Sequence, residues 1–493
     1  IFNVDPVQTK IHNDTVDLEL RIYEGPQFTN NRIKLIGNTI TNEKVVMREI
    51  RTKPGDKFSK KDLVRTVREI GALGNFDESK TNPRPIPNTQ DGTVDIEYTV
   101  EEKPSDQVEL SGGFGGGRVI GTLGLTFNNF SIRNLFNGEA YKPLPKGDGQ
   151  KLSLRGQTNG KYYQSYSFSF SEPWLGGNKP ISFGLSAFTS LQSNGFSPAA
   201  TGYSKIRLNG FSVSLGKVLK WPDNFFRLSY TINTQQYKLN NYEGFLFSTG
   251  TSYNFNLTQE ITRDSRNSPI FPTDGSYFKF LIQATPPYSL LNDVNYKTAS
   301  DKQRYKFTEY HKWKIESQWF QRVAGKLVFK AQAQFGFLGL YNSAVGQSAF
   351  ERFKLGGDGM QGFDFLQGSE LIAMRGYANN SVIPVGSNPR IAQASGSPIF
   401  AKYVMELRYP VVSSQQATAF LTLFGEGGNT WNKFSEFNPF NVRRSVGVGA
   451  KIFLPIFGLL GIDYGYGFDN IPGVPDANKG QFHFSIAQQL GGL

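Results

Sequence analysis

The chain has 493 residues, a formal net charge of +12, 53 glycines and an aromatic content of 14%. It has no cysteine, which excludes disulfides, thiolate metal sites and cysteine nucleophiles. No run of about 18 apolar residues occurs, so we expect no transmembrane helix; the aromatic residues and glycines instead favour many β-strands.

Residues 1–104 are charged and partly helical. Residues 16–22 alternate between apolar and polar side chains, as in a strand, and Gly25-Pro26 ends this segment. The opening residues resemble the middle of a domain, so we expect further sequence upstream of Ile1. From residue 27 we expect, in order, a strand at 32–36, a helix at 42–50, a second helix, a weak strand near Phe76 and a strand at 93–101.

The second helix has a defined start. A serine before the first turn and an acid within it, Ser59 and Asp62, suit the exposed N–H groups of a helix. Apolar residues recur at helical spacing after Ser59 at Leu63, Val67, Ile70 and Leu73.

After the strand at 93–101, Glu101-Glu102-Lys103-Pro104 marks a boundary, which predicts one domain at 27–104 and another at 105–493.

Beyond residue 105, segments of strict period two take over. In 327–337, for example, leucine, phenylalanine and alanine alternate with lysine and glutamine. Such a strand packs its apolar face on a second sheet in a soluble sandwich, or turns it to lipid in a membrane barrel. The barrel is favoured because the strands are long, they number about sixteen, and short turns alternate with long loops, of which 338–398 is the longest.

The strands of this predicted all-β transmembrane barrel are antiparallel. We place them at 108–117, 119–128, 149–158, 161–171, 180–190, 205–217, 225–236, 247–259, 276–285, 303–318, 326–338, 399–409, 416–427, 443–453, 457–467 and 481–490.

The long loop carries Arg375, Gly376 and Tyr377. A loop of about sixty residues is far longer than the roughly 15 beyond which loops are usually functional or disordered. Two carboxylates, Glu406 and Glu426, lie on the inward phase of neighbouring predicted strands. We interpret this set as a loop lock in which the guanidinium binds both acids. Ordinary salt bridges that fill a polar lumen are the alternative.

Glycines dominate the first barrel strand, at Gly112, Gly113, Gly115 and Gly116. The segment lacks the Lys-Ser/Thr of a phosphate-binding loop and opens no helix. Glycine weakens a strand because it costs backbone entropy and packs no side chain. A closed barrel must pair its first strand with its last, so we predict a weak lateral seam here; a harmless flexible terminus is the alternative. On the last strand the seam residues are Phe482, Phe484, Ile486 and Leu490.

Other chemistries find no support in the sequence. The three histidines, His12, His311 and His483, lie far apart, which predicts no metal site. The basic balance suits nucleic acid, anionic lipid or a polar lumen. No compact basic run with interleaved aromatics occurs, so we expect no nucleic acid. No catalytic constellation stands out, and we predict neither an enzyme nor a cofactor.

Taken together, these residues resemble the BamA family of outer-membrane insertases over nearly the whole chain. Arg375-Gly376-Tyr377 is similar to the family's Arg-Gly-Phe loop motif, with Tyr377 in the aromatic position, and Glu406 and Glu426 match its acidic partners. By this resemblance, residues 27–104 are the last α+β POTRA domain and residues 1–26 the end of a preceding one. The Gly-Gly-Asp-Gly at 356–359 and the long insertion resemble versions from Bacteroidota.

The resemblance implies an outer-membrane protein of a Gram-negative bacterium with a periplasmic POTRA part. It implies insertion of β-barrel proteins through a seam between 108–117 and 481–490, without chemistry or nucleotide. The implied partners are unfolded outer-membrane β-barrel proteins, accessory periplasmic lipoproteins and other subunits of an assembly complex, and outer-membrane lipid and lipopolysaccharide. An exporter of the two-partner-secretion type and a porin or transporter are the alternatives.

Overall fold

The computed structural model describes residues 2–12, 15–24, 27–115, 118–141, 144–177, 179–242, 247–359, 368–413, 417–454 and 458–487. These residues divide into two compact units. Unit 1 contains residues 1–108, 125–153 and 170–179, and unit 2 contains residues 109–124, 154–169 and 180–493. None of the described helices is long and apolar enough to cross a membrane.

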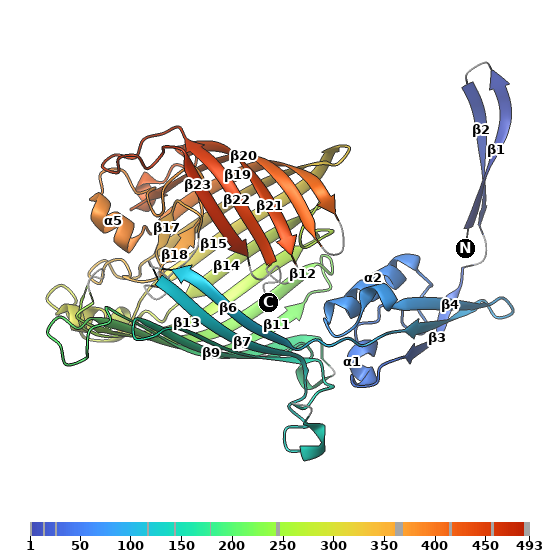
Figure 1. Ribbon diagram of the computed structural model, residues 1–493, viewed down its shortest axis with the longest axis horizontal. Coiled ribbons are helices and arrows are strands. Elements are labelled where there is room, and N and C mark those ends of the chain that lie inside the picture. Colours follow the sequence, from blue (N-terminus) through green and yellow to red (C-terminus); the bar gives the residue numbers. More distant parts are fainter. Residues whose placement is uncertain are drawn as a thin grey trace. The chain divides into compact units, whose positions relative to one another are not determined.

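Unit 1 begins with a two-stranded antiparallel hairpin, β1 (Phe2–His12) and β2 (Thr15–Glu24). A three-stranded sheet of order β3-β5-β4 follows, with two helices beside it (Figure 1). Their bounds are β3 Thr29–Ile36, α1 Glu43–Met47, α2 Lys60–Ala72, the 3-10 turn η1 Glu78–Lys80, β4 Asn82–Asn88 and β5 Thr93–Thr99.

The core of this sheet and its helices follows the predicted periodicities. Ser59 accepts a hydrogen bond from the Asp62 amide at 3.3 Å, which starts α2 at the expected residue. Side chains at alternate positions of β5 are buried, among them Val94 and Ile96. They pack with Leu63 and Ile70 of α2 and with other apolar residues of the same cluster.

The expected weak strand near Phe76 is wrong. Phe76 is fully buried and makes only an isolated bridge to Glu102, and the third strand is β4, six residues later. Its sequence, NPRPIPN, contains three prolines, which argue against a strand interior. The sheet tolerates them because β4 lies at its edge and pairs only with β5 in the order β3-β5-β4.

Sixteen strands form one sheet, in the order β23-β22-β21-β20-β19-β16-β15-β14-β13-β12-β11-β10-β9-β8-β7-β6. The described ladders between neighbouring strands of this sheet are antiparallel, as predicted. The bounds are β6 Gln107–Gly115, β7 Arg118–Phe130, β8 Gln150–Asn159, β9 Tyr163–Glu172, β10 Ile181–Ser193, β11 Lys205–Val218, β12 Phe226–Asn240, β13 Gly250–Asp264, β14 Gly275–Ala284, β15 His311–Ala324, β16 Leu327–Gly339, β19 Ile399–Ser413, β20 Thr418–Trp431, β21 Arg443–Leu454, β22 Gly458–Gly467 and β23 Gln481–Ala487.

One predicted strand has the wrong start. The strand expected at 303–318 is β15 and begins at His311, because the chain first makes a helical turn, α4 (Asp301–Arg304). A capping box between Ser300 and Gln303 stabilises that turn. The other connections of the sheet contain η2 Gly138–Ala140, η3 Leu175–Gly177, α3 Tyr288–Leu291 and η5 Phe434–Glu436.

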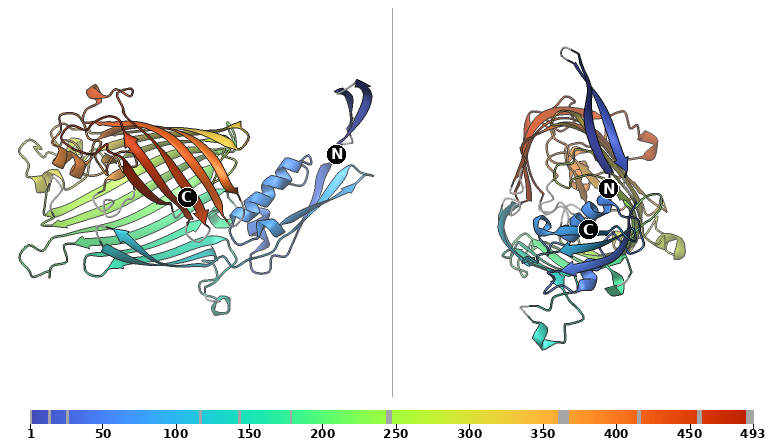
Figure 2. Two further views of the ribbon diagram at one scale, coloured as in Figure 1. Left: turned by 45° about the horizontal axis from the view of Figure 1, so that its top comes forward. Right: turned by 90° about the vertical axis from the view of Figure 1, so that its right-hand side faces the viewer.

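The long loop between β16 and β19 contains secondary structure of its own. It contains β17 (Phe353–Leu355), β18 (Glu370–Ile372) and α5 (Pro389–Ser395), and β17 and β18 pair in parallel. Within unit 2 the strands curve around these segments (Figure 2). The loop therefore packs against the inner face of the sheet and forms a core there.

Candidate functional site

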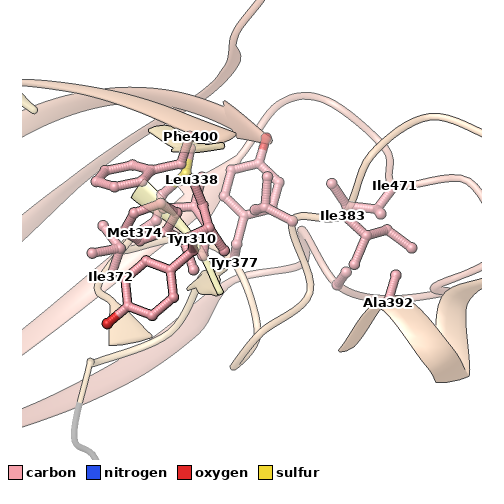
Figure 3. Packing of buried hydrophobic residues seen from close by; sticks show 13 residues of the cluster. Tyr310, Leu338, Ile372, Met374, Tyr377, Ile383, Ala392, Phe400 and Ile471 are labelled. Atoms are coloured by element: carbon pink, nitrogen blue, oxygen red, sulfur yellow. The ribbon is translucent and has the colours of Figure 1, made fainter. Parts of the chain in front are cut away.

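The candidate site is the tripeptide Arg375–Gly376–Tyr377 together with the inner face of strands β19 to β23. An apolar cluster holds the tripeptide in place (Figure 3). Met374 and Tyr377 are fully buried in it, against residues such as Phe400 of β19. Backbone hydrogen bonds between Gly357 and Met374, at 3.0 and 3.1 Å, fix the chain directly before Arg375.

Arg375 donates to carboxylates of three strands. Its Nε and backbone N–H bind Glu426 of β20 at 2.7 and 2.8 Å, and its Nη2 binds Glu406 of β19 at 2.6 Å. Its Nη1 binds Asp463 of β22 at 3.1 Å. The guanidinium also lies over the ring of Phe424, 3.6 Å from the centroid. These planar, charge-assisted contacts fix the orientation of Arg375 as well as its position. We name Arg375, Glu406, Glu426 and Asp463 the tip cluster.

Each carboxylate of the tip cluster also has a cation on the wall. Glu406 binds Arg408 at 2.7 Å, Glu426 lies 3.6 Å from Lys402, and Asp463 binds Lys451 at 3.1 Å. The three acids are almost completely buried, and a buried charge is tolerated only when it is paired. The wall cations therefore match the three wall acids, and Arg375 adds a further positive charge.

Gly376 brings the backbone of the tripeptide against the wall. Its φ is +86°, which favours glycine, and an added Cβ would lie 2.7 Å from the Cβ of Ser445. The wall has glycines opposite: a Cβ on Gly465 would lie 2.5 Å from the Gly376 nitrogen, and one on Gly467 2.7 Å from its oxygen. Glycines on both sides therefore permit this close approach.

Polar contacts also fix Gly376 and Tyr377. The Gly376 N–H donates to Nε2 of His483 on β23 at 2.8 Å. Ser445 of β21 donates to the Arg375 carbonyl at 2.6 Å. The Tyr377 hydroxyl shares its proton between the carbonyls of Arg444, at 3.0 Å, and Asp469, at 3.2 Å. The tripeptide thus binds β19, β20, β21, β22 and β23 through Glu406, Glu426, Ser445, Asp463 and His483.

The structure brings together all five residues of the predicted loop lock. It adds three residues that the predicted lock did not include, Asp463, His483 and Ser445. The sequence contains a signal for two of them. Asp463 is a lone acid and His483 a lone imidazole on the inward phase of their strands, as Glu406 is a lone acid on β19. The contact of Ser445 depends on the path of the loop and has no such signal.

A second ion-pair cluster attaches the loop at another place. Lys312 and Lys314 of β15 meet Glu351 and Glu370 of the loop, and we name these four residues the base cluster. The Lys312 ammonium lies 3.0 Å from Glu351 and 3.2 Å from Glu370, and Lys314 pairs with Glu370. Lys312 also lies 4.8 Å from the centroid of the Phe353 ring.

The predicted seam residues lie on the two end strands of the sheet. Gly112, Gly113 and Gly115 are in β6; Phe482, Phe484 and Ile486 are in β23. Phe482 is 77% exposed and Phe484 44% exposed, so both face outward. Gly116 and Leu490 lie outside the described residues. Within the part of the chain that the structure describes, β6 and β23 stand at opposite ends of the strand order and no ladder joins them.

Unit 1 contains a polar junction between its small sheet domain and the connections of the large sheet. Asn42 donates to Asp148 at 2.8 Å, and Asn129 donates to Thr41 at 2.8 Å. Trp174, after β9, donates its Nε1–H to Glu49 at 2.7 Å. Burial raises the pKa of the Glu49 carboxyl above its ordinary value, and the Trp174 hydrogen bond opposes this shift.

Comparisons with known proteins agree with this architecture. The model of the Omp85 superfamily domain matches residues 146–490, and the POTRA model, described as a surface antigen variable number repeat, matches residues 28–103. The solved BamA of Haemophilus ducreyi lacking POTRA domains 1–3 is similar in fold, with a TM-score of 0.55 and 18% identity over 98% of this chain and 89% of that one.

Two curated relatives carry the name outer membrane protein assembly factor BamA. The protein of Neisseria meningitidis serogroup B is 22% identical over 443 residues, which are 85% of this chain and 48% of the relative. The protein of Nitratidesulfovibrio vulgaris is 25% identical over 496 residues, which are 98% of this chain and 54% of the relative. The chain therefore spans about half the length of the curated relatives it matches.

Proposed function

The chain belongs to the Omp85 superfamily, and from this premise we propose that it folds and inserts β-barrel proteins into the outer membrane. The resemblance to the BamA family and the barrel fold class with a POTRA region are confirmed. The protein is located in the outer membrane, with its POTRA part in the periplasm. The similarity to versions from Bacteroidota stays a prediction.

The observation that best supports this function is the position of β6 and β23 at the two ends of the sheet. The edge of an end strand presents unpaired N–H and C=O groups, which can pair with a strand of another chain. In our proposal the seam between β6 and β23 opens sideways and templates the strands of an unfolded outer-membrane protein. No nucleotide or cofactor takes part.

A short apolar belt beside the seam is a second contribution in this proposal. Lipid adapts to a short belt by thinning. In our proposal the bilayer is thinnest beside the seam, which lowers the barrier to insertion there.

The loop lock has a role in this proposal. Arg375 with Glu406 and Glu426 holds the long loop in the lumen and keeps the wall in shape while the seam opens.

The proposed partners are unfolded β-barrel proteins, accessory periplasmic lipoproteins and other subunits of an assembly complex, and outer-membrane lipid with lipopolysaccharide. The proposed domain limits are 1–26 and 27–104 for the POTRA parts and 105–493 for the barrel.

The test is the folding of an unfolded β-barrel protein into liposomes with and without this protein. One cysteine in β6 and one in β23 lock the seam reversibly, since the chain has no native cysteine. A matched control joins Thr231 and Thr258, which already face each other in the ladder of β12 and β13. We expect acceleration that the seam disulfide abolishes, that reductant restores and that the control disulfide leaves intact.

Other outcomes assign other functions. Acceleration that the seam disulfide does not change contradicts the lateral mechanism. If the unlocked protein gives no acceleration, the insertase proposal fails for this chain. Passage of a protein into the liposome interior then identifies an exporter, and solute-selective conductance identifies a porin or transporter.

A further inference from the structure

His483 lies between the loop tip and the last strand of the sheet, β23. Among the described residues, β23 pairs with β22 over seven residue pairs, from Leu459–Ala487 to Gly465–Gln481. Phe482 and Phe484 point outward on either side of His483, whose side chain is 5% exposed on the inner face. Its Nε2 accepts the Gly376 N–H at 2.8 Å. The loop tip is thereby bonded directly to the terminal strand.

The donor of this hydrogen bond, the Gly376 N–H, is both fixed in position and buried. The Gly376 N–H is held in place because the preceding Arg375 binds three carboxylates and Tyr377 is fully buried. The N–H is itself buried, so without His483 it would lose its partner, which is costly. His483 of β23 supplies the acceptor. An imidazole nitrogen accepts a hydrogen bond only while it carries no proton.

We propose that His483 is the positioning residue through which the loop tip holds β23 in the sheet, so that the state of one imidazole sets how easily the edge of the seam detaches. This inference rests on the proposed function for the meaning of the seam, whereas the attachment of β23 stands by itself. Arg375, Glu406 and Glu426 hold the loop against the wall; His483 transmits that hold to the last strand.

Histidine makes the attachment sensitive to protons, because its charge changes between about pH 5 and 8. The charged groups that face it are Asp463 of β22, directly opposite in the ladder, Glu426 of β20, and Arg375 and Asp358 of the loop. A proton on Nε2 turns the acceptor into a donor that points at the Gly376 N–H. The imidazolium is also repelled by Arg375, which carries a like charge. Both changes weaken the contact between β23 and the loop tip, so acid detaches the strand from the tip.

The test is hydrogen–deuterium exchange of the full chain in detergent, read as protection factors of the 481–487 peptide at pH 8 and pH 5. His483→Phe removes the acceptor, and His483→Gln replaces it with an uncharged amide oxygen. His311→Gln is the matched control, since His311 lies on β15 and accepts from Trp313. At pH 8 we expect His483→Phe to lower the protection of β23 at least about fivefold, because a buried N–H loses its partner.

The other variants decide the role of the proton. The wild type and His311→Gln should lose protection of β23 on going to pH 5, whereas His483→Gln should keep it at both pH values. Equal protection of β23 in His483→Phe and the wild type overturns the inference. So does a loss of the same size in β10 to β13, which would indicate general loosening, or a pH response in His483→Gln that equals that of the wild type.

Failure of this inference and failure of the proposed function give different results. If the wild type accelerates folding of a β-barrel protein and His483→Phe leaves β23 protected, the insertase stands and the attachment through His483 falls. If His483→Phe exposes β23 but the wild type accelerates nothing, the attachment stands and the insertase falls.

Discussion

The long loop is attached to the sheet at two places whose charges are reversed. In the tip cluster the loop supplies the cation, Arg375, and the wall supplies the carboxylates; in the base cluster the wall supplies Lys312 and Lys314 and the loop supplies Glu351 and Glu370. Reversed polarity prevents either part of the loop from binding the site of the other, because like charges would face each other. Each cluster therefore specifies its own position.

The two clusters also differ in the number of strands that they bind. The base cluster holds a single strand, β15, through flexible ammonium groups. The tripeptide at the tip binds five neighbouring strands through a planar guanidinium, a tyrosine hydroxyl and three backbone groups. We infer that the base positions the loop and that the tip holds together the C-terminal part of the sheet, up to its last strand.

Arg375→Ala tests this difference with the largest expected effect. Removal of one partner from a buried ion-pair network costs about 3 kcal/mol at the low end of the usual range. The low end applies because the wall carboxylates keep their own cations, Arg408, Lys402 and Lys451. The barrel should still fold but lose its heat-modifiable migration on gels at a lower temperature. Arg375→Lys should fall in between, since lysine lacks the planar fork; an unchanged transition in Arg375→Ala would contradict the role of the tip.

Gly376→Ala should have the second-largest effect on stability. The Cβ meets Ser445 at 2.7 Å in a backbone conformation with φ of +86°. Gly386→Ala is the matched control, because Gly386 has φ of +77° on the same loop but no atom within 4 Å of an added Cβ. We expect Gly376→Ala to destabilise the barrel by about 2 kcal/mol more than the control, measured by denaturant unfolding. Equal effects would show that close contact with the wall is unimportant.

Glu370→Gln at the base should cost about 1–2 kcal/mol, measured in the same unfolding experiment. Glu351 remains 3.0 Å from Lys312, so only Lys314 loses its partner. A cost equal to or above that of Arg375→Ala would reverse the ranking of the two clusters.

Tyr377→Phe should have the smallest effect, about 1 kcal/mol. The ring stays buried, and only the hydroxyl contacts with Arg444 and Asp469 are lost. Thermal unfolding measures the cost. No change in Tm would mean that the hydroxyl adds nothing to the aromatic ring at this position.

The sequence predicted the parts of the molecule that depend on local periodicity. The sixteen strands follow from period two, and the start of α2 follows from Ser59 and Asp62. β4 was missed because its three prolines oppose a strand, and only its edge position in the sheet makes them acceptable. Glu406 and Glu426 could be found as lone acids on an inward phase. The contacts of Ser445, and the glycines that admit Gly376, could not, because they depend on the path of a loop with no period.

The most direct test of the central claim is strand-resolved hydrogen–deuterium exchange of Arg375→Ala against the wild type. If the tripeptide holds the C-terminal part of the sheet together, protection falls in β19 to β23 and stays unchanged in β10 to β13. A uniform fall across the sheet, or a fall confined to the loop itself, would contradict the claim that the tip fastens the strands up to the edge of the seam.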